Sequence, residues 1–266
     1  MSVKIRRVKR ARFALLVVLV ILLVLVFALS RPDLSSFAKR LESIREQLFG
    51  EERPRVALVK WFPFSEENAL KEWEEKIFRG RVLYRVEKDL STSFVHATSF
   101  STASALYYKI RLDTKTRQPV ISWKWHVEKF PEKSGPEALE TTSSDDFAAR
   151  IYVIFSARFF THTRVIEYVW TESLPVGQTG ISPYSKNIRL MVLKCGKPSE
   201  DLLCGEERAI IDDYVTLFGE RPRLDVGAIA FMTDADTTGT TADALYTDIK
   251  LGYKDQVLIS DKKGTP

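Results

Sequence analysis

A short polar segment near the C-terminal end of the chain, TDADTTGTTAD at residues 233–243, carries side chains that can bind a metal ion. Asp234, Asp236 and Thr238 place oxygen ligands at alternate positions and a glycine follows them, as in the first half of a calcium-binding loop. The bidentate glutamate that completes such a loop is missing, because Leu245 occupies its position. The segment predicts a structural calcium site. A tight turn between two strands is the alternative, since Asp, Thr and Gly also suit turns.

Aromatic and charged side chains at alternate positions form a second candidate site. In ISWKWHV and IEYVW the aromatic residues recur at every second position, so in a β-strand they share one face. Paired aromatic faces can stack on a sugar ring, while charged side chains can hydrogen-bond its hydroxyl groups. The alternatives are an aromatic core and a solvent-exposed ion pair between strands. The candidate ligand-binding residues are Trp123, Trp125, Asp146, Arg150, Glu167, Tyr168 and Trp170.

Sequence signatures of catalysis are absent: the chain has no G-x-S-x-G, H-E-x-x-H, P-loop or G-x-G-x-x-G motif. Glycoside cleavage would need two carboxyl groups about 5 to 10 Å apart. Asp146 and Glu167 would serve if they faced each other in a cleft. The sequence therefore favours a non-catalytic role and leaves a glycosidase or lyase as an alternative.

The elements that must position these residues begin after Pro54, where short runs rich in β-branched and aromatic residues alternate with turn residues. We expect helices from Ser65 to Gly80 and over residues 210–218, before Gly219. Without regular strand–helix alternation, the pattern favours a mainly β, antiparallel, jelly-roll-like sandwich with two short helices in one domain, residues 54–254. Strands are predicted near residues 56–61, 82–88, 93–99, 104–112, 119–127, 146–156, 164–170, 187–194, 226–233 and 243–251.

The first thirty residues have the pattern of a membrane anchor. Residues 1–12 hold six Lys and Arg side chains, and residues 13–29 contain no polar side chain. This predicts a cytoplasmic basic segment and a transmembrane signal-anchor helix over residues 13–30, with the rest of the chain exported. A cleaved signal peptide is the alternative, because Ala28-Leu29-Ser30 fits a small-x-small cleavage site.

The anchor also explains the net charge of +5. Residues 1–30 contain no acidic side chain, so the remaining 34 of the 40 Lys and Arg residues stand against all 35 Asp and Glu residues. The exported part is therefore nearly neutral and has no basic cluster of the kind that binds nucleic acid.

Between anchor and domain, residues 31–53 predict an amphipathic stalk helix. Its apolar positions recur at spacings of three and four residues, and they are Leu34, Phe37, Leu41, Ile44 and Leu48. A stalk or a helix packed on the domain satisfies this pattern, and so does a short coiled coil that would make the protein a homodimer.

The two cysteines bracket a polar, turn-like insert, GKPSEDLL. In an oxidising exported compartment, this spacing favours a disulfide between Cys195 and Cys204. Closing a loop of this size would stabilise the fold by roughly 2.7 kcal/mol. Two thiols without a bond, or half of a metal site, are the alternatives.

A family resemblance covers roughly residues 60–252, and a set of motifs in fixed order carries it. The motifs are FPFSEENALKEWEEKIFRGRVLY, ISWKWHV, SDDFAARIYVIF, IEYVW, SPYSKNIRLMVL, ERAIIDDYVTLFG and VGAIAFMTDADTTGTTADALYTDIKLG. In these motifs the chain resembles the bacterial family catalogued as domain of unknown function 3047, which implies no reaction, cofactor or site residues. Its closing segment, residues 244–251, also looks like the last strand of jelly-roll carbohydrate-binding modules.

Together these features favour a single-pass inner-membrane protein with its bulk in the periplasm. Its sandwich would bind a glycan or another component of the cell envelope without catalysis. The alternatives are a carboxylate-dependent glycoside hydrolase or lyase on a jelly-roll scaffold, and a structural or assembly partner of an envelope complex.

Overall fold

The computed structural model describes residues 56–89, 92–156, 162–198 and 203–254. The chain divides into two units, Met1–Arg53 and Pro54–Pro266, and every described residue belongs to the second. The predicted membrane anchor, the stalk helix and residues 255–266 lie outside the described residues. Within the described ranges, no helix is long and apolar enough to cross a membrane.

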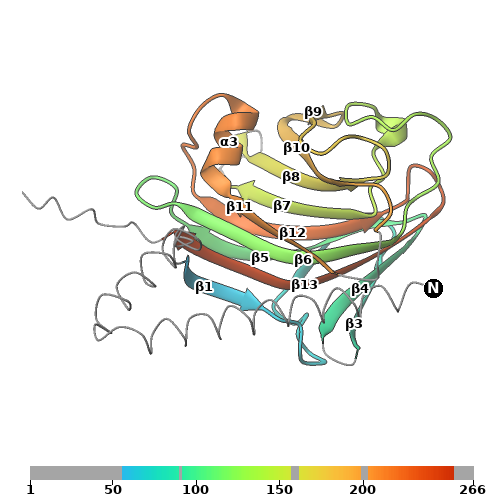
Figure 1. The fold of residues 1–266 in the computed structure, drawn as a ribbon, viewed down its shortest axis with the longest axis horizontal. Helices are drawn as coiled ribbons and strands as arrows, with labels where there is room; N and C mark the ends of the chain where they lie inside the picture. The colour runs from blue at the N-terminus through green and yellow to red at the C-terminus, as the bar shows by residue number, and fades with distance from the viewer. Residues whose placement is uncertain (1–55, 90–91, 157–161, 199–202, 255–266) are drawn as a thin grey trace, which may run out of the picture. The chain divides into compact units, whose positions relative to one another are not determined.

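Two β-sheets packed face to face form the described domain (Figure 1). Sheet A contains, in spatial order, β11 (Cys204–Ala209), β6 (Pro119–Lys129), β13 (Thr241–Lys254), β4 (Ser93–Phe100) and β3 (Leu83–Lys88), and β1 (Val56–Phe62) also pairs with β13. Sheet B contains β2 (Glu74–Arg79), β5 (Ala103–Leu112), β12 (Val226–Asp234), β7 (Ala149–Phe155), β8 (Arg164–Thr171), β10 (Ser185–Cys195) and β9 (Thr179–Ser182). A 3-10 turn, η1 (Thr142–Ser144), and one α-helix, α3 (Ile210–Phe218), complete the described elements.

Alternation along the strands explains why the chain folds into two layers. In β7, the side chains of Ile151 and Val153 point into the space between the sheets, while Arg150 and Tyr152 point away from it. Burying one face of each sheet in this way removes apolar area from water, which is the main driving force for folding. The prediction of a mainly β sandwich is confirmed.

The predicted helix from Ser65 to Gly80 is wrong. Residues 67–72 form turns, and β2 follows and pairs with β5. The spacing of Leu70, Trp73 and Ile77 imitates a helix. In the structure, however, Trp73 packs 4.8 Å from the ring of Phe62, whereas Ile77 is exposed. Pairing with a long neighbouring strand outweighs a weak local helix propensity.

The second predicted helix is confirmed as α3. It ends at Gly219, whose φ of 72° lies in the left-handed region that glycine adopts without strain. Each predicted strand has a counterpart, but three strands were missed: β2, β9 and β11. One strand pair, β8 with β10, is parallel and not antiparallel as expected.

The predicted disulfide is also wrong. In the described part of the chain, Cys195 and Cys204 are not joined. Cys195 ends β10 in sheet B, whereas Cys204 begins β11 in sheet A, opposite Trp125. The two cysteines therefore belong to strands of different sheets, and their closeness in sequence does not pair them in one hairpin.

The backbones of β1 and β13 approach closely at Gly252, where a Cβ atom would lie 2.6 Å from the carbonyl oxygen of Ala57. We therefore expect Gly252→Ala to lower the free energy of unfolding by about 1–3 kcal/mol through overpacking, measured by urea denaturation followed by circular dichroism. The matched control is Gly135→Ala, because a Cβ there would meet nothing within 4 Å. Equal losses in the two variants would contradict the close approach.

Candidate functional site

The side of sheet B that faces away from sheet A carries most of the polar side chains expected to bind a ligand; we call it the outer face of sheet B. On β7 and β8 it presents Arg150, Tyr152 and Glu167. Glu167 lies directly opposite Tyr152 in the strand register. Arg150 precedes Tyr152 by two residues along β7, so its side chain lies on the same face. The three side chains are therefore neighbours because two antiparallel strands align them.

Arg150 is the centre of a buried group of charges, which we call the Arg150 cluster: Arg150, Asp145, Glu167 and Asp234. Its Nη1 donates to Oε1 of Glu167 at 2.7 Å. Its Nε and Nη2 donate to the two carboxylate oxygens of Asp234 at 3.0 and 2.8 Å, in a bidentate pair. Oδ2 of Asp145 lies 3.5 Å from both terminal nitrogens. Only 3% of Arg150 is exposed, so the guanidinium is surrounded by protein.

Burial and charge compete in this cluster. Burial raises the pKa of Asp145 to about 7, because the nearby Arg150 only partly offsets the loss of solvation and Glu167 adds repulsion. Burial also raises the pKa of Asp234 well above its usual range, against the attraction of Arg150. The alternative of a solvent-exposed ion pair is wrong, because Arg150 and Glu167 are buried in a network that also involves a third strand, β12.

Asp146 points to a different partner. Its Oδ1 and Oδ2 accept hydrogen bonds from the backbone N–H groups of Thr237 and Thr238, at 3.2 and 2.6 Å. The carboxylate therefore fastens the turn between β12 and β13 to the segment before β7. The hydroxyl of Thr238 hydrogen-bonds Thr240 and the carbonyl oxygen of Ala235.

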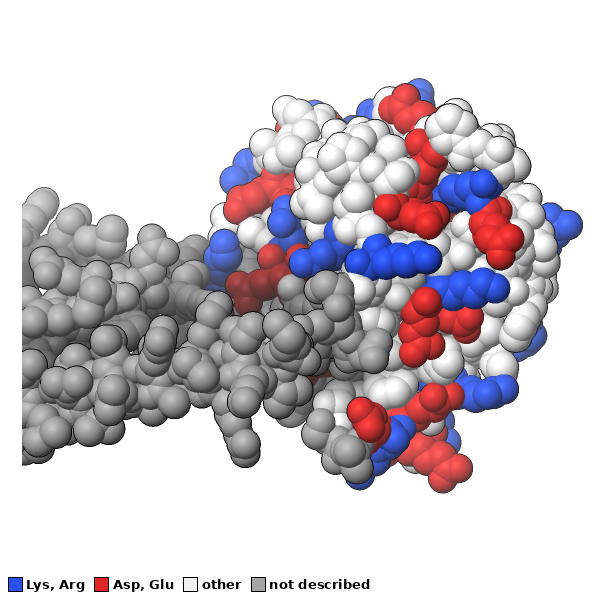
Figure 2. Space-filling model, turned by 45° about the vertical axis from the view of Figure 1, so that its right-hand side comes forward, with Lys and Arg blue, Asp and Glu red and all other residues white. Residues whose placement is uncertain are grey.

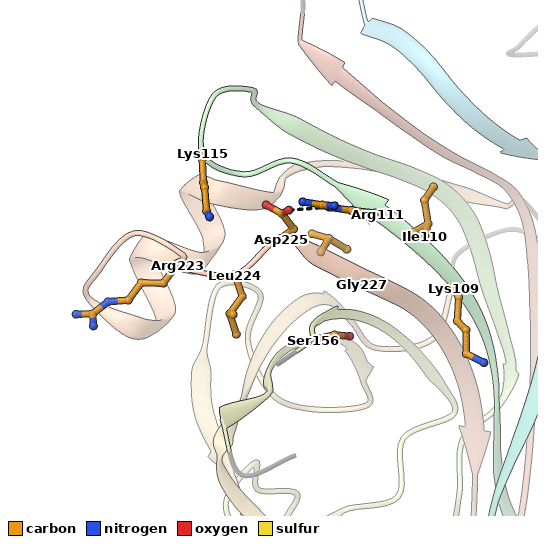
Figure 3. A pocket seen from close by; sticks show the side chains of 10 residues that line it. Lys109, Ile110, Arg111, Lys115, Ser156, Arg223, Leu224, Asp225 and Gly227 are labelled. Atoms are coloured by element: carbon orange, nitrogen blue, oxygen red, sulfur yellow. Dashed lines mark hydrogen bonds and ion pairs between the residues drawn. The ribbon is translucent and has the colours of Figure 1, made fainter. Parts of the chain in front are cut away.

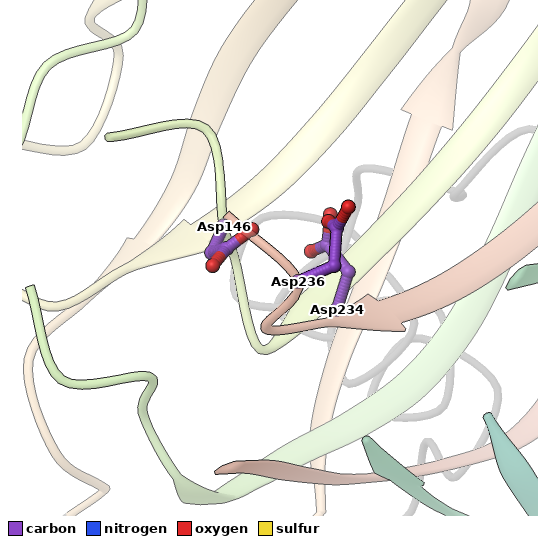
Figure 4. Close-up of side chains that lie close together, drawn as sticks. All are labelled: Asp146, Asp234 and Asp236. Carbon is purple, nitrogen blue, oxygen red and sulfur yellow. The ribbon is translucent and has the colours of Figure 1, made fainter. Parts of the chain in front are cut away.

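Three carboxylates meet at this turn (Figure 4). Ligand oxygens of Asp146, Asp234 and Asp236 all lie within 4.8 Å of one another. The structure thus brings together two of the residues predicted to bind calcium, with Asp146 and not Thr238 as the third. Burial and the neighbouring charge of Asp146 raise the pKa of Asp236.

The aromatic residues predicted to stack on a ligand lie in the core between the sheets. Trp123, Trp125, Tyr168 and Trp170 are each exposed by 2% or less. The rings of Trp123 and Tyr168 stack at 5.4 Å, and those of Trp125 and Trp170 lie 5.7 Å apart. These side chains fill the interior, so they cannot form a platform for a sugar.

A different pair of aromatic residues lies on the outer face of sheet B. In the register, Ala230 of β12 stands between Tyr107 of β5 and Tyr152 of β7, and we call these three residues the tyrosine row. Strands about 4.8 Å apart place the two tyrosines roughly 10 Å from each other. Both are half-buried, whereas Ala230 and the neighbouring Ala105 are buried and small. Part of each tyrosine ring therefore remains accessible to solvent and projects above the small alanine side chains.

The tyrosine hydroxyl groups are held in place by neighbours. That of Tyr107 donates to Oε2 of Glu74 at 2.5 Å, and Lys109 bonds the other oxygen of the same carboxylate at 2.7 Å. The hydroxyl of Tyr152 lies 3.5 Å from Nη1 of Arg150 and 3.7 Å from the sulfur of Met232. Burial raises the pKa of Tyr152 well above its usual range, so its phenol is neutral at physiological pH.

Sequence reasoning missed the tyrosine row, although a signal for it exists. In the segment ALYYKIR, Tyr107 has the same parity as Lys109 and Arg111, which marks a polar face. Likewise, Tyr152 has the parity of Arg150.

Two surface pockets lie outside the tyrosine row, and Lys109, the neighbour of Tyr107, borders the second. One, of about 670 Å³, is lined by Glu67, Asn68, Leu70 and Lys71. The other, of about 590 Å³, is lined mainly by Lys109, Arg111, Lys115, Arg223 and Asp225 (Figure 3).

Three of the four basic side chains that line the second pocket have acidic partners. Arg111 pairs with Asp225 at 3.0 Å, Lys109 with Glu74 at 2.7 Å, and Arg223 with Glu220 at 3.3 Å. Acidic and basic side chains also intermingle on the face of the domain shown in Figure 2. These pairings leave the second pocket little net charge with which to attract an anion.

Several solved structures are similar to this chain. The family 11 carbohydrate-binding module of a cellulosomal cellulase from Clostridium thermocellum has 8% sequence identity and a TM-score of 0.38, covering 75% of this chain and 95% of the module. The xyloglucanase domain of NopAA from Sinorhizobium fredii, in complex with cellobiose, has 10% identity and a TM-score of 0.39, covering 68% and 93%. Such distant likenesses carry no argument about what this chain binds.

Comparison at the level of sequence gives a firmer result. No curated protein matches the chain. A family model described as "Protein of unknown function (DUF3047)" matches residues 71–250, which include every residue of the Arg150 cluster and of the tyrosine row. The match covers most of the chain and confirms the resemblance found in its motifs, so the chain belongs to the DUF3047 family.

Proposed function

We propose that this domain binds a glycan on the outer face of sheet B, without catalysis. The tyrosine row carries the proposal. Two tyrosine rings roughly 10 Å apart, with a buried alanine between them, offer two apolar ring surfaces on which alternate units of a sugar chain can stack. Because Trp123, Trp125 and Trp170 are buried in the core, the proposed stacking depends on Tyr107 and Tyr152.

Polar groups beside the row would hydrogen-bond the hydroxyl groups of the sugar. Glu74 and Lys109 are exposed next to Tyr107, and they already hold its hydroxyl group and its ring. On the other side of Ala230, the Arg150 cluster fixes Tyr152 from below. Arg150 and Glu167 therefore position the ring of Tyr152, since burial keeps them from touching a ligand.

A glycosidase or lyase is the second candidate, because Asp145 and Glu167 pair a carboxyl group of raised pKa with a second carboxylate. The geometry opposes it. Both carboxylates contact the same guanidinium, and Asp145 is only 7% exposed. No space for a sugar unit separates two carboxylates that share one arginine, so we favour binding.

The cellular setting of the domain remains part of the proposal. The basic residues before the apolar stretch at residues 13–29 support a single-pass inner-membrane anchor, with the jelly-roll-like domain in the periplasm. The stalk pattern of residues 31–53 supports a homodimer. A glycan of the cell envelope would be within reach of a domain held there.

The test is calorimetric titration of the purified full-length chain with cell-envelope polysaccharides, after a glycan array has identified the best ligand. We expect Tyr152→Ala and Tyr107→Ala each to weaken binding about tenfold, since each removes a stacking surface worth about 1 kcal/mol or more. Tyr152→Phe keeps the ring and should bind within about threefold of the unaltered chain.

Phe100→Ala is the matched control, because it removes an exposed aromatic ring from sheet A. It should leave affinity unchanged. The proposal fails if no envelope polysaccharide binds, or if the Phe100 variant loses as much affinity as the tyrosine variants.

A further inference from the structure

Around the turn after β12, carboxyl groups outnumber the arginine side chains that contact them. Five carboxyl groups lie at this turn or in the Arg150 cluster that adjoins it, and they belong to Asp145, Asp146, Glu167, Asp234 and Asp236. Of the described arginines, Arg150 contacts three of these carboxylates, and Arg79 donates to the backbone carbonyl oxygen of Asp236 at 3.0 Å. Among the contacts of these two arginines, Asp146 and the side chain of Asp236 therefore have no guanidinium partner. Uncompensated buried charge is costly, so a bound cation would stabilise these carboxylates in their ionised form.

A second, independent observation concerns Asp145, which shares Nη2 of Arg150 with Asp234. Oδ1 of Asp145 is buried and has no hydrogen-bond partner. Its other oxygen lies 3.5 Å from Nη2 of Arg150, the nitrogen that also bonds Asp234. Asp145 is more than nine-tenths buried and precedes Asp146 in the chain. A buried carboxylate oxygen without a donor points to a group that protein atoms do not supply.

We propose that a calcium ion binds between Asp146, Asp234 and Asp236, with Oδ1 of Asp145 reaching the ion through a bound water. Calcium–oxygen distances of about 2.3–2.6 Å allow two ligand oxygens to lie up to about 5 Å apart across the ion. The observed spread of up to 4.8 Å fits this limit. Magnesium needs shorter, octahedral contacts of about 2.0–2.1 Å, which narrows the limit to about 4.2 Å.

The carboxylates of Asp146 and Asp234 still have lone pairs that can coordinate a calcium ion. Each carboxylate offers about four lone-pair sites. Asp146 uses two of them for backbone N–H groups. Asp234 uses three, for the backbone of Phe147 and two nitrogens of Arg150. Each can therefore still donate a lone pair to the ion while it keeps the contacts of the fold.

The site joins three parts of the chain that the fold alone brings together: the segment before β7, the end of β12 and the turn that follows. An ion there would fasten the start of β7 and the end of β12, beside the Arg150 cluster. Its existence does not depend on what the tyrosine row binds, and the two proposals can fail separately.

The test uses the purified full-length chain after treatment with a chelator. Calorimetric titration with CaCl₂ should show one ion per chain with a dissociation constant below about 1 mM, the weak end for extracellular calcium modules. Calcium should also raise the midpoint of thermal unfolding more than the same concentration of MgCl₂, because a ligand that binds only the folded state stabilises it.

Asp236→Asn is the first variant, since Asp236 is only half-buried and the fold should tolerate the change. It should weaken calcium binding at least tenfold. Asp225→Asn, a change at a carboxylate paired with Arg111 outside the cluster, should leave the affinity unchanged. The proposal is overturned by the absence of saturable binding at about 1 mM calcium, by equal stabilisation with magnesium, or by equal affinities in the two variants. If Asp236→Asn does not fold, the calcium and magnesium comparison on the unaltered chain decides.

Discussion

Replacing Arg150 by methionine should lower the free energy of unfolding by about 3–5 kcal/mol, the usual cost of removing one partner from a buried ion pair. Methionine keeps much of the volume of the side chain but removes the guanidinium. Asp145, Glu167 and Asp234 would then face one another without a positive charge between them. Urea denaturation followed by circular dichroism, with and without calcium, measures the loss.

The matched control for this change is Arg111→Met. Arg111 also pairs with a carboxylate, that of Asp225 at 3.0 Å, but its side chain is 86% exposed. Exposed ion pairs contribute about 0–1 kcal/mol, so this variant should stay within that range. A loss of less than about 1 kcal/mol in Arg150→Met would show that the cluster does not depend on its guanidinium.

The second large effect is expected from Trp125→Ala, which should cost about 3–5 kcal/mol of stability by opening a cavity in the core. Trp125 is fully buried and packs 5.3 Å from the ring of Trp123 and 5.7 Å from that of Trp170. The same denaturation measurement applies. Phe78→Ala is the control, since its exposed ring leaves no cavity behind.

Trp125→Phe separates packing from hydrogen bonding at the same position. The indole N–H of Trp125 is buried without a partner, so its removal relieves a group that lost solvation on folding. We expect a smaller loss than in the alanine variant, about 1–3 kcal/mol. Glycan affinity should not change in either folded variant. A loss of affinity without a loss of stability would contradict the assignment of Trp125 to the core.

Local patterns explain why much of the fold could be predicted. Alternation in segments such as ARIYVIF is set by neighbouring residues, and it gives strand identity without knowledge of the partner strand. The helix over residues 210–218 was found for the same reason, because an apolar spacing and a terminal glycine are both local. The helix predicted from Ser65 to Gly80 is wrong, because pairing of β2 with β5 outweighs the helix-like spacing of this segment.

The candidate site depended on contacts that no local pattern contains. Alternation placed Trp123 and Trp125 on one face of a strand, but it could not say whether that face turned inward. The Arg150 cluster joins residues 145, 150, 167 and 234, which meet only because β12, β7 and β8 are adjacent in sheet B. Asp146 likewise lies near the carboxylates of Asp234 and Asp236 only because the fold brings the segment before β7 to the end of β12.

By itself, then, the sequence determined most of the strands, the sandwich class, the family and the alternating faces, since each depends on residue type and short spacing. Strand order and register were decided by the tertiary structure alone. They put the indoles in the core, set Tyr107 and Tyr152 on either side of Ala230, and gathered the carboxylates around Arg150. The physical reason is that packing energy is shared among residues distant in sequence, so the inner face of each strand is chosen by its partners.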